Sequence, residues 1–297
     1  MTDPGLSGVF TAPVTPFTED GSAVDFAAYE ALVEAQLAAG VSALVPCGTT
    51  GESPTLTDSE QVELVQRTAA LAKGRALVYA GTGSNNTKKT IEASRAALEA
   101  GADGVMIVMP YYSKPSQEGL IRHVDLVAKA VSAPVILYNI PGRCGVDLSV
   151  DSLLRVLDAN PNVVGLKDAS GNVLYCQDIV RRAGDRISVL SGDDVLTLPL
   201  MSVGARGVIS VTANVYPKQV GDVVRAAAAG RWQDARREHL RQVPVHRAFF
   251  IEPNPAPVKA ALAAQGRMHA TVRPPLVEAS AQCRAEVAQV MRAFEAS

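Results

Sequence analysis

The amino-acid sequence predicts an α/β protein with a closed (β/α)8 (TIM) barrel and a C-terminal helical extension. Eight short apolar runs alternate with longer helical patterns, and the eight units have nearly even lengths. The chain of 297 residues is also long enough, because a barrel of this kind needs roughly 250 residues. We therefore expect the barrel over residues 1–229 and the extension over residues 230–297.

The predicted strands are eight runs rich in Val, Ile and Leu. They lack strict alternation of apolar and polar residues, which suits parallel strands that are covered on both faces. These strands are residues 9–14, 43–46, 76–80, 104–108, 135–138, 163–167, 187–190 and 207–210.

The predicted helices lie between these strands, and several begin at Asp or Thr and end near Gly, as helix caps require. A doubly wound open sheet is the competing architecture, but no GxGxxG motif follows the first strand. The helices of the barrel are residues 25–39, 58–71, 87–100, 117–130, 150–157, 172–183, 195–203 and 217–229, and those of the extension are residues 231–250, 256–265 and 276–296.

Composition and charge exclude several classes of function. The formal net charge of −2 gives no reason to expect nucleic acid or an anionic membrane as a partner. The N-terminal residues contain no basic segment followed by an apolar one, and no run of 18 apolar residues exists, so we expect a cytoplasmic protein. The four cysteines are widely spaced and match no zinc pattern, so they are interpreted as reduced packing residues.

Polar residues that follow the predicted strands are the first candidates for a site, because barrel active sites lie at the carboxyl ends of the strands. Lys167 ends the sixth strand, where desolvation would disfavour its cation and free the amine as a nucleophile. An ion-paired lysine explains the position equally well. Tyr138 ends the fifth strand and could transfer protons, or could simply be an interior aromatic residue.

Three further segments follow strands. The Gly-rich loop from Gly48 to Glu52 could hold a small carboxylate, or could be an ordinary turn. Arg143 could bind a second carboxylate, or could be a solvated loop charge. Asp193 and Asp194 have no accompanying histidine, so no metal site is expected, and Asp194 is interpreted as an acid at a helix N-terminus.

The full set of motifs resembles the pyruvate-dependent class I aldolases, the family of dihydrodipicolinate synthase and N-acetylneuraminate lyase. Arg143 and the segment EPNPAPVK are typical of the synthase branch. The resemblance covers nearly the whole chain and is carried by APVTPF at 12–17, GTTGES at 48–53, PYY at 110–112, YNIPGR at 138–143, GLKD at 165–168, SGDD at 191–194, GVISV at 207–211 and EPNP at 252–255.

This resemblance implies an enzyme of lysine and diaminopimelate biosynthesis. It would condense pyruvate with L-aspartate 4-semialdehyde to give 4-hydroxy-tetrahydrodipicolinate. Lys167 would form the Schiff base with pyruvate, so no metal or organic cofactor is expected. The other implied roles are proton transfer by Tyr138, Thr49 and Tyr112, and substrate binding by Thr50, Arg143, Ile209 and Gly192.

The family also implies a homotetramer built as a dimer of dimers, in which Tyr112 reaches the site of a neighbouring subunit. Many family members are inhibited by lysine at an interface site, where this chain retains Asn85 and Tyr111. Its residues at the variable positions of that site are Asp58, Gln61 and Lys89. Because Lys89 would repel a cationic ligand, the sequence predicts weak or absent lysine inhibition.

Two rival functions follow from the same residues. The first is a sister aldolase or lyase acting on N-acetylneuraminate or a 2-keto-3-deoxy sugar acid, which would keep Lys167 and Tyr138. The second is a barrel without catalytic activity that serves as a binding or regulatory subunit.

Overall fold

Eight parallel strands close into a barrel in the computed structural model of the protein, which describes residues 5–297. Each strand pairs with its neighbours in chain order, and β8 closes the ring by pairing with β1. This arrangement confirms the predicted barrel and excludes the open sheet. The strands are β1 (Gly8–Thr11), β2 (Ala43–Leu44), β3 (Leu77–Gly81), β4 (Gly104–Val108), β5 (Val135–Asn139), β6 (Val163–Asp168), β7 (Ser188–Ser191) and β8 (Gly207–Ser210).

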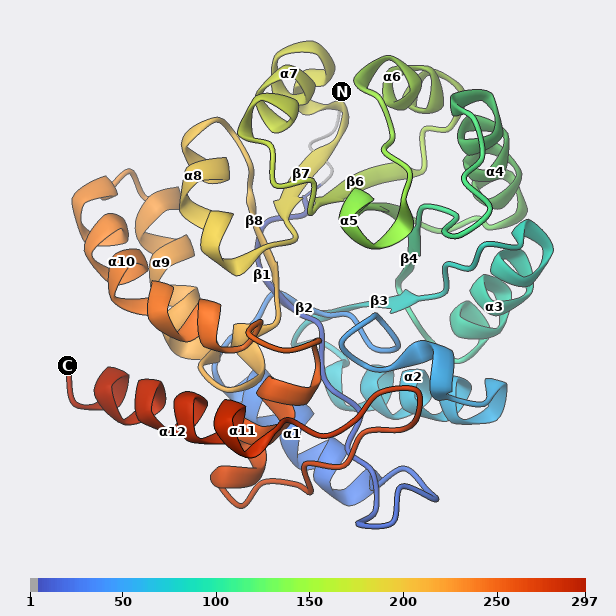
Figure 1. Ribbon diagram of the computed structural model, residues 1–297. Helices are drawn as coiled ribbons and strands as arrows, with labels where there is room; N and C mark the ends of the chain where they lie inside the picture. The colour runs from blue at the N-terminus through green and yellow to red at the C-terminus, as the bar shows by residue number, and fades with distance from the viewer. Residues whose placement is uncertain (1–4) are drawn as a thin grey trace.

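A ring of helices surrounds the strands (Figure 1). At the N-termini of α1 to α4, α6 and α7, a side chain accepts a backbone N–H group that has no partner inside the helix. At α2, for example, Thr57 and Glu60 cap each other's backbone in a capping box. The outer helices are α1 (Phe26–Ala38), α2 (Asp58–Ala72), α3 (Thr87–Glu99), α4 (Gln117–Ala130), α6 (Val150–Ala159), α7 (Val173–Ala183), α8 (Thr197–Ser202) and α9 (Pro217–Ala228).

Some boundaries differ from the sequence prediction for local reasons. The helix predicted over residues 195–203 is split into a 3-10 turn, η3 (Asp194–Leu196), and α8. The short helix α5 (Pro141–Cys144) was not predicted, because a single turn is too short for a periodic pattern. The last helix begins at Ala281 and not at residue 276, because the Ser280 side chain accepts the Cys283 N–H and caps the helix there.

The interior of the barrel is filled by an apolar cluster. The rings of Phe10 on β1 and Tyr79 on β3 stack with centroids 6.0 Å apart, although these strands are not neighbours. This contact therefore crosses the inside of the barrel. The cluster consists of Leu6, Phe10, Ala12, Ala43, Val45, Tyr79, Met106, Ile136, Tyr138, Leu190 and Ile209.

The C-terminal segment forms three helices beside α1 and α9 (Figure 1). They are α10 (Trp232–Ala248), α11 (Ala256–Ala264) and α12 (Ala281–Glu295). Their apolar residues share one cluster with Val14 and Leu32 from the first part of the chain, so the extension is packed on the barrel. The division at residue 229 stays a prediction.

The structure also bears on the predictions for the cysteines and for membrane-spanning helices. All four cysteines are buried and free, as packing residues should be. None of the helices within residues 5–297 is both long enough and apolar enough to cross a membrane.

Candidate active site

Parallel pairing brings the predicted site residues of β5 and β6 together. Tyr138 is the register partner of Lys167, and Leu190 on β7 is the register partner on the other side. Tyr138 and Leu190 belong to the interior cluster, so Lys167, which is paired between them, lies level with them near the carboxyl ends of the strands. This is the end where barrel enzymes carry their chemistry.

Lys167 is buried, and its pKa is lowered mainly by desolvation. Lys167 is 4% exposed, and its Nζ lies 4.2 Å from the centroid of the Tyr138 ring. Burial lowers the pKa of Lys167 from 10.5 to about 8, Asp194 opposes this change and Arg143 adds to it. Within residues 5–297, Lys167 forms no salt bridge, so the ion-paired alternative does not describe it. The amine therefore has the chemistry of a nucleophile at near-neutral pH.

Gly192 lies against the stem of this lysine, and Ile209 lies in the interior cluster of packed side chains that includes Tyr138. A Cβ at Gly192 would lie 3.1 Å from the Lys167 Cγ and 2.8 Å from the Ala169 Cβ, so the lysine stem occupies the space of the missing side chain. Ile209 is 1% exposed and belongs to the interior cluster with Tyr138. Gly192 therefore packs against Lys167, and Ile209 shares the interior cluster with Tyr138, while the substrate-binding roles of the two residues stay predictions.

Tyr138 is 5% exposed and keeps its proton. Burial raises the pKa of its hydroxyl above the ordinary value, while the Arg143 charge and a hydrogen bond with the Thr49 side chain lower it. The hydroxyl is thus a proton donor that can exchange a proton through Thr49. This interaction supports the first part of the predicted relay, from Tyr138 to Thr49, which stays a prediction.

Unlike Lys167 and Tyr138, Tyr112 lies on the surface of the single chain. Tyr112 is 88% exposed, and its φ of 70° lies in the left-handed region. In the single chain it projects from the surface, so the second part of the relay, from Thr49 to Tyr112, stays a prediction.

Arg143 lies in α5, the short helix that follows β5 near the centre of the ring in Figure 1. The side chain is exposed and forms no ion pair within residues 5–297. Its charge lowers the pKa of both Lys167 and Tyr138, so it acts on the same site. Arg143 is therefore free to bind an anionic group brought by a ligand.

Asp194 has a larger role than the sequence suggested. Its carboxylate is 2% exposed and accepts hydrogen bonds from the Ser210 Oγ and from the N–H groups of Val211 and Thr212. It therefore fixes the segment after β8 and places a negative charge near Lys167. Asp194 does begin the 3-10 turn η3, as the sequence indicated, and the hydrogen bonds from Ser210, Val211 and Thr212 also hold its carboxylate inside the protein.

Two residues of the extension, for which no role was predicted, contact the loop after β2. The Asn254 Nδ2 donates to the Thr50 Oγ1 at 3.0 Å. The Lys259 Nζ donates to the Glu52 Oε1 at 2.7 Å, and both side chains are fully buried. Both residues belong to EPNPAPVK, but only tertiary contacts reveal what the segment touches.

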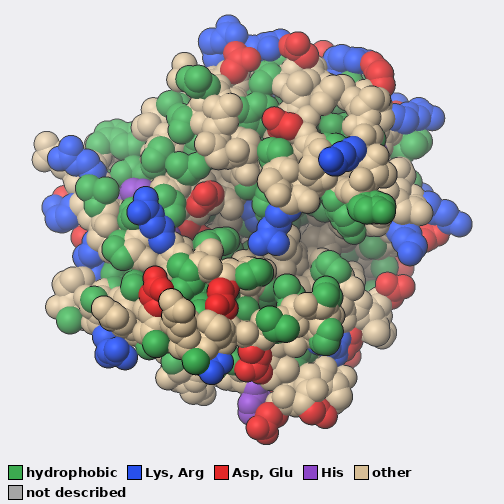
Figure 2. Space-filling model, in the orientation of Figure 1, with side chains coloured by type: hydrophobic (Ala, Val, Ile, Leu, Met, Phe, Trp, Pro, Cys, Tyr) green, Lys and Arg blue, Asp and Glu red, His purple; other side chains and the backbone are tan. Residues whose placement is uncertain are grey.

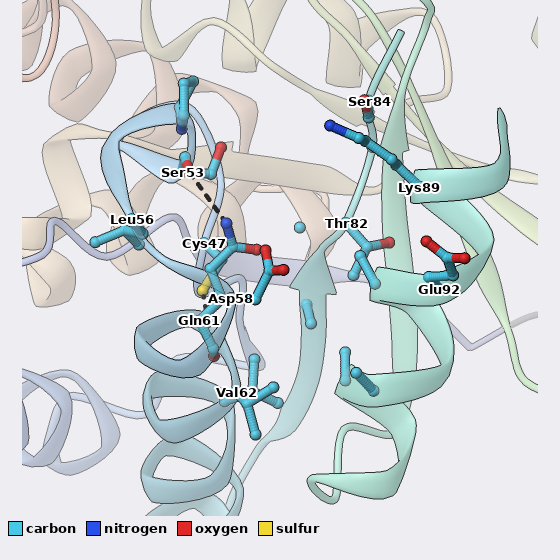
Figure 3. Close-up of a pocket in the computed structure, with 18 of the residues that line it drawn as sticks. Cys47, Ser53, Leu56, Asp58, Gln61, Val62, Thr82, Ser84, Lys89 and Glu92 are labelled. Atoms are coloured by element: carbon cyan, nitrogen blue, oxygen red, sulfur yellow. Dashed lines mark hydrogen bonds between the residues drawn. The ribbon is translucent and has the colours of Figure 1, made fainter. Parts of the chain in front are cut away.

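A cavity of about 510 Å³ lies between α2 and α3, beside the loop after β2. Figure 3 shows Asp58 and Gln61 of α2 on one side, and Lys89 and Glu92 of α3 on the other. Tyr111 also lines the cavity, whereas Asn85, predicted for the same site, is not among its lining residues. Lys167 does not line it, so this cavity is separate from the candidate active site.

The molecular surface has a hollow through which solvent could reach the candidate site. The face seen in Figure 2 is hollowed near its centre, and both basic and acidic side chains lie around the hollow. Charged substrates could therefore approach the carboxyl ends of the strands from solvent.

Comparisons with known proteins agree with this geometry. The chain is 62% identical to a 4-hydroxy-tetrahydrodipicolinate synthase of Sorangium cellulosum, covering 98% of this chain and 97% of the relative. It is 47% identical to a synthase of that name from Geobacter sulfurreducens, covering 98% and 99% of the two chains.

A solved structure of a synthase also matches this chain over nearly its whole length. The 4-hydroxy-tetrahydrodipicolinate synthase of Methylacidiphilum fumariolicum matches with a TM-score of 0.96 at 43% identity, over 98% of this chain and 96% of that one. The sequence pattern of the dihydrodipicolinate synthetase family matches residues 5–294. With Lys167 and Tyr138 in contact at the carboxyl ends of a closed barrel, this chain belongs to the dihydrodipicolinate synthetase family.

Proposed function

We propose that this protein is a 4-hydroxy-tetrahydrodipicolinate synthase, a lyase of lysine and diaminopimelate biosynthesis that condenses pyruvate with L-aspartate 4-semialdehyde. The observation that carries the proposal is the buried amine of Lys167, with a pKa of about 8 and 4.2 Å from the Tyr138 ring. The match to synthases over nearly the whole chain supports the choice of substrates.

The first half of the reaction captures pyruvate. The neutral amine of Lys167 attacks the ketone carbon, and loss of water gives the protonated imine. This imine withdraws electrons from the neighbouring methyl group, which loses a proton and becomes the nucleophilic carbon of an enamine. Because the imine stabilises the developing negative charge, the route requires no metal or organic cofactor.

The second half joins the two substrates. The enamine carbon attacks the aldehyde carbon of aspartate semialdehyde, and the aldehyde oxygen takes a proton and becomes a hydroxyl group. The amino group of the substrate then attacks the imine carbon, closes the six-membered ring and displaces the amine of Lys167. Tyr138 moves the protons, since its hydroxyl stays protonated and is linked to Thr49.

Four residues bind the two substrates in this proposal. Thr50 and the neighbouring backbone amides hold the pyruvate carboxylate, and Ile209 and Gly192 shape the pocket around the pyruvate methyl and the lysine stem. Arg143 binds the carboxylate of aspartate semialdehyde through paired N–H donors. Its exposed position and lack of an ion pair within residues 5–297 support this role.

The assembly is proposed to be a homotetramer, a dimer of dimers, in which Tyr112 enters the site of the neighbouring subunit. The 88% exposure of Tyr112 supports this, because a tyrosine ring so exposed has an apolar surface that an interface would cover. The four buried free thiols support a cytoplasmic location, where cysteines stay reduced.

Lysine is proposed to inhibit weakly or not at all. In the cavity of Figure 3, the ammonium group of Lys89 faces the side where Asp58 lies and would repel a second ammonium group. Half-maximal inhibition by sub-millimolar lysine would contradict this expectation.

The test of the proposed function is covalent capture. Borohydride added with pyruvate should reduce the imine and attach a three-carbon adduct, which peptide mapping should place on Lys167. Lys167→Ala should lose both the adduct and the activity. An unchanged mass of the wild-type protein would instead favour the barrel without catalytic activity.

The sister aldolases share this adduct, so a second assay separates them. Ring formation from pyruvate and aspartate semialdehyde should be lost in Arg143→Ala at low aldehyde concentration, while the pyruvate adduct still forms. The identity to synthases does not favour acylneuraminate or sugar acids as substrates.

A further inference from the structure

Asn254 connects the helical extension to the loop that is proposed to hold pyruvate. It lies between α10 and α11, 204 residues after Thr50, and its Nδ2 donates to the Thr50 Oγ1 at 3.0 Å. Asn254 is 5% exposed and Thr50 is 3% exposed, so water does not readily replace either partner. The bond is therefore a persistent part of the site.

The direction of this hydrogen bond fixes what the Thr50 hydroxyl can still do. A hydroxyl group has one hydrogen to donate and two lone pairs to accept. Because Asn254 occupies a lone pair of Oγ1, the hydroxyl hydrogen must point elsewhere, and accepting one bond strengthens the donation of another. Within residues 5–297, the Thr50 side chain makes no second hydrogen bond, so its hydrogen is available to a ligand.

The rest of the extension holds the same loop in place. The Lys259 Nζ donates to the Glu52 Oε1 at 2.7 Å and to the Thr15 carbonyl oxygen at 2.8 Å. The N–H of Arg273 donates to the Glu52 Oε2 at 3.0 Å. With Glu52 held from two sides, Thr50 cannot move far, and Asn254 decides how its hydroxyl group is oriented.

We infer that Asn254 is a positioning residue that turns the hydroxyl hydrogen of Thr50 toward the carboxylate of the keto-acid substrate. A carboxylate only accepts hydrogen bonds, so it requires a donor at this place. The inference rests on the proposed function, which places the pyruvate carboxylate at Thr50. It makes the extension part of the substrate site and not only a packing element.

The test is a double-mutant cycle read through steady-state kinetics. Asn254→Ala should raise the KM for pyruvate about tenfold, the value of one hydrogen bond of modest strength to a charged group, and leave kcat unchanged. Thr50→Val should raise the KM by itself. In the Thr50→Val background, Asn254→Ala should add nothing, because its effect passes through the hydroxyl group.

The control is Gln242→Ala, which removes another buried amide of the extension, one that donates to the Gln219 carbonyl oxygen at 2.9 Å. This variant should lose stability in thermal unfolding and keep the wild-type KM. If Asn254→Ala does not fold, Asn254→Leu removes the same donor and keeps most of the volume.

The outcomes separate this inference from the proposed function. If the wild-type protein forms no pyruvate adduct with borohydride, the proposed function fails. If the adduct forms but Asn254→Ala keeps the wild-type KM, the positioning role is wrong. An equal rise of KM in the wild-type and Thr50→Val backgrounds also overturns it, since Asn254 would then act independently of the hydroxyl group.

Discussion

The pH dependence of imine formation tests the central claim about Lys167. Burial lowers the pKa of this amine from 10.5 to about 8. At pH 7.4, roughly one amine in five is then neutral, against roughly one in a thousand at the ordinary pKa. The gain in reactive amine is about 250-fold, and each pKa unit corresponds to about 1.4 kcal/mol.

The assay is the rate of adduct formation with saturating pyruvate and cyanoborohydride, followed by mass spectrometry from pH 6 to pH 10. Because the neutral amine reacts, the rate should rise about tenfold per pH unit at low pH and level off above pH 8. Lys167→Arg should give no adduct and serves as the background. A rate that still rises between pH 9 and pH 10 would refute the argument from desolvation.

The same burial affects stability. The folded-state pKa of Lys167 lies below the unfolded value, so between about pH 8 and pH 10.5 the unfolded chain binds more protons. The free energy of unfolding should therefore rise with pH across this window, and burial of the cation should cost up to about 3 kcal/mol below it. Lys167→Met should then be more stable than the wild type at pH 7 in urea unfolding, and equal or lower stability would contradict the prediction.

Three further variants test the surroundings of the site. Asp194→Asn removes the charge that raises the pKa of Lys167, so the midpoint of the pH profile should move below 8, and an upward shift would contradict the assignment. Lys259→Met leaves the carboxylate of Glu52 buried without its partner and should lower the free energy of unfolding by about 3 to 5 kcal/mol. Adding Glu52→Leu should recover part of this loss, as measured by urea unfolding. Gly192→Ala places a Cβ 3.1 Å from the Lys167 Cγ and should lower kcat by about tenfold or more, because small displacements of a reacting group are costly. Wild-type kcat in that variant would show that the lysine stem has room.

Strand and helix patterns determined most of the fold. Runs such as residues 104–108 and 207–210 matched their strands at both ends. The pattern was less informative where an element is short, as in α5, or where one capping side chain decides the boundary, as Ser280 does. A periodic signal needs more than one turn to be recognised, and a cap depends on a single hydrogen bond.

The sequence was sufficient to predict the candidate reacting residues, because the closed barrel itself brings them together. In a closed barrel, every strand ends on the same face, so residues that follow the strands converge whatever their distance along the chain. Lys167 and Tyr138 could therefore be predicted from their places at strand ends, and register pairing brings them into contact. The family motifs then identified the chemistry.

Other properties of the site arise only from the tertiary structure. Nothing in the sequence predicts that Asn254 reaches Thr50, that Lys259 is buried against Glu52, or that Asp194 accepts three hydrogen bonds from the end of β8 and the residues that follow it. These contacts join segments about 200 residues apart or turn a side chain inward, which no local pattern encodes. The sequence by itself thus predicted which groups react, while packing decided the pKa of the amine and the orientation of its partners, because burial and hydrogen-bond direction depend on the whole fold.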